Sequence, residues 1–206
     1  MKKEMKPEDV HMAGWALMIG TTVFVIALLA GYVADAFNAD LWFLPTILIP
    51  FLCMPLLLVG MLALRSRYGE KVGGAAKNIL LITAVLGTIT SIAGIFLAGV
   101  NESWLLIYTG PAILFTGLTL FGVAALYKKP LARWNSLPLL AGLWYPIFFF
   151  PQSQLSILVT GGPYIETVNA FPAALIMALI MLQSGALFML GYILKSDVPE
   201  EMVAAA

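Results

Sequence analysis

Few side chains in this sequence could carry out acid–base, nucleophilic or metal chemistry. The 206 residues include one histidine, His11, and one cysteine, Cys53. A single cysteine excludes an internal disulfide, and a single histidine excludes a multi-histidine metal site or paired-histidine haem ligation. His11 stands beside Asp9, ahead of the first apolar stretch, where we expect it to cap or anchor a helix. We therefore expect a non-enzymatic protein and assign it no cofactor and no metal.

The stretch GLWYPIFFFPQSQL, residues 142–155, is chemically distinct because polar side chains interrupt an apolar run. Two interpretations are open. In the first, which we favour, a helix bends at Pro146 and Pro151, and the glutamines bond the carbonyls that the prolines free. In the second, the break lines a cavity open to the outside, roofed by Tyr164 and Glu166, and a cavity that extends to Gln183 would support a carrier. The candidate ligand-binding residues are then Trp144, Tyr145, Gln152, Gln154 and Gln183.

Gln183 itself has two possible roles. It lies with Ser184 near the middle of an otherwise apolar stretch. An inward-facing glutamine can hydrogen-bond a neighbouring membrane helix, which stabilises the pair by about 1 kcal/mol or less. We favour this structural role over a contact with a solute.

The composition places most of the chain in lipid. Hydrophobic residues make up 61% of it and charged residues only 11%, with a mean hydropathy of +0.96, whereas soluble domains are nearer one quarter charged. Helices satisfy their own backbone hydrogen bonds in lipid, and none of the apolar stretches alternates as a barrel strand would. We expect an all-α polytopic membrane bundle, forming a single domain over residues 1–206. Its six spans are about residues 12–33, 41–64, 79–100, 104–127, 137–159 and 171–194.

The charges alternate between the links. All eleven basic residues lie in the N-terminal segment, the second link, the fourth link and the C-terminal segment. The charged residues of the other three links are all acidic, namely Asp35, Asp40, Glu102 and Glu166. Because basic links stay on the cytoplasmic side, this pattern places both termini there, in the cytoplasmic membrane. A cleaved signal peptide is the alternative for the first span, since residues 34–36 read Ala-Asp-Ala. We favour a retained helix because the apolar run is longer than a signal core.

Small residues indicate how the helices pack. In the third span, one face gathers Thr83, Gly87, Thr90, Ser91, Gly94 and Ala98, and small faces let membrane helices approach closely. The second, fourth and sixth spans share similar endings around Gly60, Gly122 and Gly191. These endings indicate either three repeated helical hairpins or only the usual composition of membrane helix ends.

Two classes of function fit these observations. The first is a non-catalytic subunit or accessory protein that packs in a membrane assembly, with lipid, other membrane subunits or copies of itself as partners. The second is a passive channel or carrier for a small neutral or lipophilic solute. Ionisable residues deep in a span usually mark proton and ion paths, and none lies deep in these spans. The zero formal net charge gives no indication of nucleic-acid binding.

Overall fold

A computed structural model of the chain describes residues 5–36, 47–97, 103–149, 151 and 173–196. Nearly all of these residues are helical, and no strand occurs among them. The expected all-α bundle is therefore confirmed. In chain order the elements are α1 (Pro7–Ala36), η1 (Ile49–Cys53), α3 (Met54–Val72), α4 (Gly74–Leu97), α5 (Ser103–Lys128), η2 (Ala132–Trp134), α6 (Leu137–Trp144), η3 (Tyr145–Phe149) and α8 (Ala173–Ser196).

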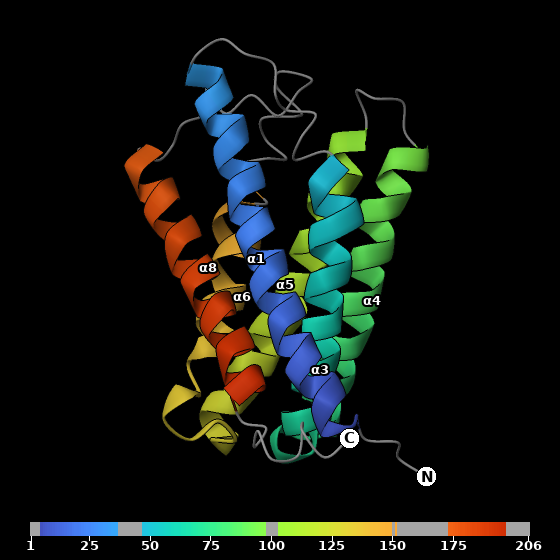
Figure 1. Cartoon of the computed structure of the whole chain (residues 1–206), viewed down its shortest axis with the longest axis vertical. Coiled ribbons are helices and arrows are strands. Elements are labelled where there is room, and N and C mark those ends of the chain that lie inside the picture. The colour runs from blue at the N-terminus through green and yellow to red at the C-terminus, as the bar shows by residue number, and fades with distance from the viewer. Residues whose placement is uncertain (1–4, 37–46, 98–102, 150, 152–172, 197–206) are drawn as a thin grey trace.

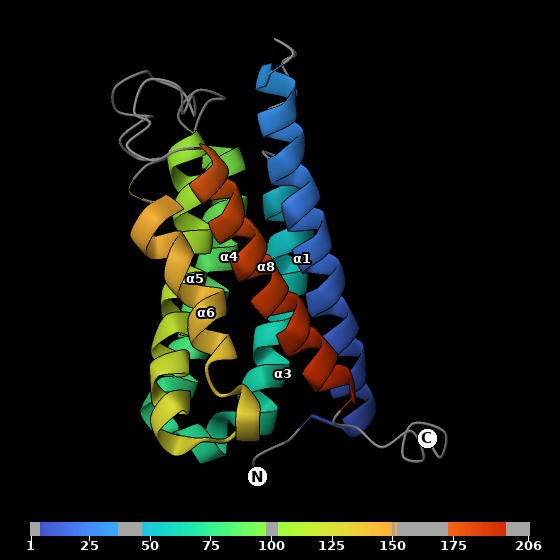
Figure 2. The same cartoon turned by 90° about the vertical axis from the view of Figure 1, so that its left-hand side faces the viewer.

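The helices stand side by side and run alternately up and down (Figures 1 and 2). Each of α1, α3, α4, α5 and α6 packs on the next helix along the chain, and α8 packs back on α1, which closes a ring. The start of α1 meets the end of α8, where Nδ1 of His11 lies 3.2 Å from the carbonyl oxygen of Lys195. All nine basic residues of the described ranges lie at this end of the bundle, which we call the basic end.

Five helical segments are long and apolar enough to cross a membrane. They are Pro7–Ala30, Ile49–Val72, Gly74–Leu97, Leu106–Lys128 and Ala178–Ser196. The sixth, formed by α6 and η3, is a shorter apolar helix over Leu137–Phe148. Most of the rest of the predicted fifth span, residues 150 and 152–159, lies outside the described residues. The chain is thus a membrane-embedded helical bundle.

The link between the second and third spans is helical, which the hydropathy pattern does not predict. α3 continues to Val72 and α4 begins at Gly74, so only Gly73 separates them. Gly73 has a φ of 119°, a conformation that favours glycine. Glu70 and Lys77 form an ion pair across the turn. Hydropathy marks where the lipid ends, but a helix can continue into the aqueous layer when its residues are good helix formers.

Prolines alter the hydrogen-bond pattern of the helices. Pro50 and Pro146 each occupy the second position of a short π-helical turn, η1 and η3 respectively. A proline has no N–H to donate to the carbonyl four residues earlier, and its ring clashes with that carbonyl. The break that the sequence predicts at Pro146 therefore takes the form of a π turn.

Pro111 lies inside α5 and leaves the carbonyl of Ile107 without its helical donor. The buried hydroxyl of Ser91, on α4, donates a hydrogen bond to this carbonyl at 3.1 Å. An unpaired carbonyl is costly in lipid because no water can reach it. A side chain of one helix thus satisfies the backbone group that a proline frees in its neighbour.

The small-residue face of α4 packs on α5, as the sequence predicts. A Cβ atom added to Gly87 would lie 2.5 Å from the carbonyl oxygen of Gly110, and one added to Gly94 would lie 2.8 Å from Cβ of Leu106. Any larger residue at either glycine would force the helices apart. The opposite side of α4 presents large exposed side chains, namely Ile82, Leu86, Ile89 and Phe96.

The closing contact of the ring also depends on glycine. A Cβ atom added to Gly14 would lie 2.7 Å from the carbonyl oxygen of Gly191, so α1 and α8 touch backbone to backbone. Gly60 likewise faces α1, whereas Gly122 faces α6. The three glycines of the suggested hairpin repeat therefore do not occupy equivalent positions.

The contact between Ser91 and Ile107 yields a testable energetic coupling. We expect Ser91→Ala to lower the free energy of unfolding by about 1 kcal/mol, because it leaves the Ile107 carbonyl unpaired. In a Pro111→Ala background the same change should cost much less, because the N–H of an alanine can satisfy that carbonyl. Denaturant unfolding in lipid–detergent micelles measures all four variants of the cycle.

Thr116→Ala is the matched control, because that hydroxyl bonds only the carbonyl of Ala112 in its own helix. It should be nearly neutral in both backgrounds. An equal loss for Ser91→Ala with and without Pro111 would contradict the proposed pairing.

Candidate ligand site in the bundle interior

Three aromatic rings meet in the bundle interior and join opposite sides of the ring of helices. Phe24 of α1 lies 6.2 Å from Phe115 of α5 and 6.4 Å from Tyr145 of η3, measured between ring centroids. Phe115 and Tyr145 are 5.3 Å apart. All three side chains are buried. We call them the aromatic trio, and they fill the interior at this level.

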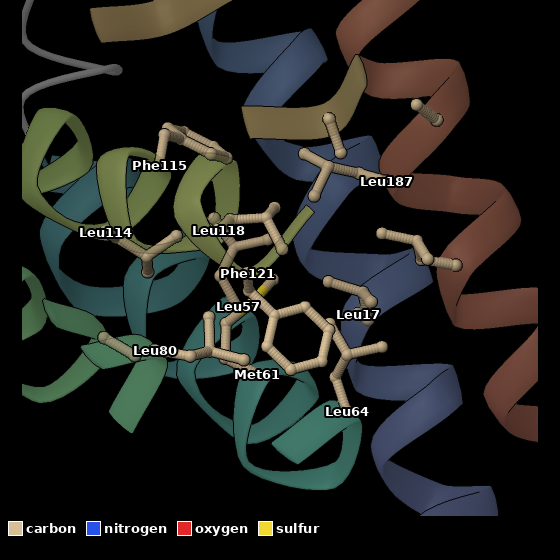
Figure 3. Close-up of a cluster of buried hydrophobic side chains, with 14 of the residues drawn as sticks. Leu17, Leu57, Met61, Leu64, Leu80, Leu114, Phe115, Leu118, Phe121 and Leu187 are labelled. Atoms are coloured by element: carbon tan, nitrogen blue, oxygen red, sulfur yellow. The ribbon is translucent and has the colours of Figure 1, made fainter. Parts of the chain in front are cut away.

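The interior between the trio and the basic end is filled by aliphatic and aromatic side chains. Figure 3 shows labelled side chains from α1, α3, α4, α5 and α8 pointing toward one another. Leu17, Met61 and Phe121 are each no more than 1% exposed. Side chains buried to this extent leave no surface for water to reach in this part of the interior. The described part of the interior is therefore a packed core.

Among the predicted site residues that the structure describes, Tyr145 combines burial with a satisfied polar group. Its hydroxyl donates a hydrogen bond to the carbonyl oxygen of Tyr108, 3.3 Å away on α5. A buried tyrosine hydroxyl usually finds such a partner. Tyr145 therefore fixes η3 against α5 as well as filling the core.

Gln183 faces the interior from α8. It is 1% exposed and shares its face with the fully buried Leu187, Leu190 and Leu194, which follow it at helical spacing. α8 ends at Ser196, thirteen positions further along the chain, which places Gln183 about 20 Å from the basic end. Its amide nitrogen, Nε2, is buried and has no hydrogen-bond partner among the described residues. Among the described residues, this nitrogen therefore does not make the hydrogen bond to a neighbouring helix that we expect of Gln183.

Ser184 and Trp144 add two further unpaired donors. Oγ of Ser184 is buried and unpartnered, on the side of α8 that Gly191 packs against α1. Trp144 is half-buried, its ring lies 5.7 Å from that of Phe148, and its Nε1 is buried without a partner. Among the described residues, three of the four unpaired buried side-chain atoms thus lie on α6 and α8, two helices in contact. The fourth is Nε of Arg65, at the basic end.

The structure brings together only some of the predicted site residues. Trp144, Tyr145 and Gln183 lie on neighbouring elements, α6, η3 and α8. Gln152 and Gln154 lie outside the described residues. Phe24 and Phe115, which close the interior, were not predicted because nothing in their sequence context separates them from other apolar helix residues. The sequence also gave no reason to single out Ser184, apart from its position next to Gln183.

The chemistry available here is neutral hydrogen-bond donation. An indole N–H, an amide NH₂ and a hydroxyl could each bind a carbonyl, an ether oxygen or a water molecule. None of these groups titrates near neutral pH, and the described residues contain no cluster of three potential metal ligands. Each of these groups can bind a neutral acceptor, and none of the three is a general acid or a general base at neutral pH.

Comparison of the chain with protein-family models, with curated protein sequences and with solved structures finds no match. The interpretation of this site therefore depends on its own geometry.

The unpaired amide of Gln183 leads to a prediction about stability. Leucine has a similar size and no polar atoms, so Gln183→Leu should leave the free energy of unfolding unchanged or raise it by about 1 kcal/mol. Tyr145→Phe is the comparison, and it should lower that free energy by about 0.5–1.5 kcal/mol because it removes a made hydrogen bond. Both are measured by denaturant unfolding of protein extracted from its own membrane. A clear loss of stability for Gln183→Leu would show that the amide has a partner in the folded protein.

Proposed function

We propose that this protein is a non-catalytic subunit or accessory protein of a membrane assembly. The observation that carries the proposal is the filled interior, in which the aromatic trio joins α1 to α5 and η3. A carrier or channel needs a path through its interior, and the described core offers none. An enzyme needs reactive groups, and the polar groups of the interior are neutral donors.

The outer surface supports a role in assembly. The small face of α4 is covered by α5 within the chain, so a partner would bind elsewhere. Gly185, on α8, is exposed and has no atom within 4 Å of where its Cβ would lie. Ala178, two helical turns away on the same side, is also exposed. Small exposed residues at this spacing allow another membrane helix to approach closely.

We also propose an orientation for the bundle. The basic end faces the cytoplasm, so α1 begins and α8 ends on that side of the cytoplasmic membrane. The support is the asymmetry of charge, since basic residues next to membrane helices stay on the cytoplasmic side. The cation of Lys195 lies 4.0 Å from the ring centre of Trp15 at this end, a combination typical of a bilayer interface.

A carrier for a small neutral solute is the second candidate. The unpaired donors of Trp144, Gln183 and Ser184 favour it, because a solute with acceptor oxygens would satisfy them. The filled interior disfavours a through-path but leaves a binding role. A bound solute found against Gln183 would support this candidate over the first.

Gentle extraction of a C-terminally tagged chain from its own membranes tests the proposed function. We expect a second membrane protein to co-purify in a fixed ratio, or the chain itself to form a defined oligomer. Gly185→Leu should reduce recovery of that partner at least threefold, since it adds bulk where a partner helix would pack. Val59→Leu, at an exposed position on α3, is the matched control and should have no effect on recovery of the partner.

The proposed orientation is tested with an antibody against the C-terminal tag. The antibody should bind only after the cells are permeabilised, because the tag then lies in the cytoplasm.

A monodisperse single chain, with no partner in any mild detergent, would contradict the proposed function. Recovery of the partner unchanged by Gly185→Leu would move the contact away from α8.

A further inference from the structure

We infer that the basic end carries a binding site for the headgroup of an anionic phospholipid. The site is a groove of about 470 Å³ between the last turns of α8, the link that joins α5 to α6, and the end of α3. The inference depends on membrane embedding and on this groove, and it does not depend on the proposed assembly. Tyr68 lines the groove from α3.

The α5–α6 link is built so that it holds a cation and an aromatic ring at the groove. α5 ends where Lys129 adopts a left-handed conformation, with a φ of 52°, and Pro130 prevents the helix from continuing. The side-chain oxygen of Asn135 then accepts a hydrogen bond from the backbone N–H of Leu131 at 2.8 Å. The chain between them forms the short helix η2, which carries Arg133 and Trp134.

Arg133 is the charged member of the groove. Its guanidinium carbon lies 5.1 Å from the ring centre of Trp134, a cation–π arrangement that positions the group. It forms no ion pair with a carboxylate of the described residues, and residues 128–137 include no acid. Lys128 and Lys129 add positive charge to the same link. The N–H groups of Arg133 therefore remain available for a phosphate, which guanidinium binds in a bidentate manner.

The other walls match the remaining parts of a lipid. Leu131, Met189 and Ile193 provide apolar surface for the upper acyl chain, and Tyr192 is 51% exposed beside them. Aromatic side chains and arginine are the residues that favour the headgroup layer. Basic pockets between membrane helices are known to bind anionic headgroups. The combination of one free guanidinium, aromatic rings and an apolar wall fits a phosphodiester with an attached chain.

A competing occupant is the C-terminal segment of the chain itself. Ser196 lines the groove, and the ten residues that follow it include Asp197, Glu200 and Glu201. Their carboxylates could also pair with Arg133. Charge alone does not separate a carboxylate from a phosphate, but the apolar wall favours an occupant that brings its own acyl chain.

Lipid retention by the full chain tests the site. The protein is reconstituted in bilayers of phosphatidylcholine with one-fifth phosphatidylglycerol, re-extracted in mild detergent, and weighed by native mass spectrometry. We expect phosphatidylglycerol to be retained in preference to phosphatidylcholine, and Arg133→Gln to reduce this retention at least threefold. Arg133→Lys should keep only part of it, because an ammonium group keeps the charge but cannot bind the phosphate in a bidentate manner. Added inorganic phosphate should not displace the lipid, because it lacks the acyl chain.

Lys128→Gln is the matched control, because it removes the same charge from the same link outside the groove. It should change retention less than Arg133→Gln does, and all variants should elute as the wild type does in size-exclusion chromatography. Equal losses for the two glutamine variants would overturn the site in favour of general charge attraction. Retention that occurs only after residues 197–206 are removed would assign the groove to the C-terminal segment and also overturn it.

Discussion

The absence of water from the hydrocarbon core is the constraint from which this structure follows. Every backbone N–H and carbonyl there must find a partner inside the protein, which only helices provide segment by segment. Where a proline removes a donor, another group must replace it. The hydroxyl of Ser91 does this for the carbonyl that Pro111 frees in the next helix. Helix contacts in this bundle thus satisfy the backbone as well as filling space.

Close approach of the helices depends on a second consequence of the same solvent. Lipid is as apolar as leucine, so burying large side chains gives little net gain, and contact energy comes from tight packing. Gly87 brings α4 onto α5, and Gly14 with Gly191 brings α1 onto α8. These contacts close the ring of helices and allow the aromatic trio to meet across it. The filled interior, on which the proposed function depends, is therefore an outcome of glycine placement.

Charge is separated from this interior along the bundle axis. The nine described basic residues lie at one end, and the interior polar groups on α6 and α8 are neutral. This separation favours the binding of anions at the basic end and of neutral acceptors at the unpaired donors of α6 and α8. The two inferred sites therefore differ in chemistry as well as in place.

The sequence predicted the fold because hydropathy and helical spacing are local properties. The six apolar stretches and the small face around Gly87 could be found without coordinates. Helix ends were less predictable. The apolar stretch of α3 ends before Arg65, but the helix continues to Val72. The sites were least predictable, since they depend on which distant residues meet. Nothing near Phe24 shows that it contacts Tyr145, and nothing near Arg133 shows that Tyr192 lies across a groove from it.

The filled interior is the central claim, and the single cysteine gives a direct test of it. Cys53 is 0% exposed and belongs to the packed core. The rate at which a small, neutral, water-soluble thiol reagent modifies it in intact membranes reports whether water reaches that core. We predict no modification until the protein is unfolded. Rapid modification in the native membrane would show a water-filled path through the bundle, contradict the filled interior, and favour a carrier.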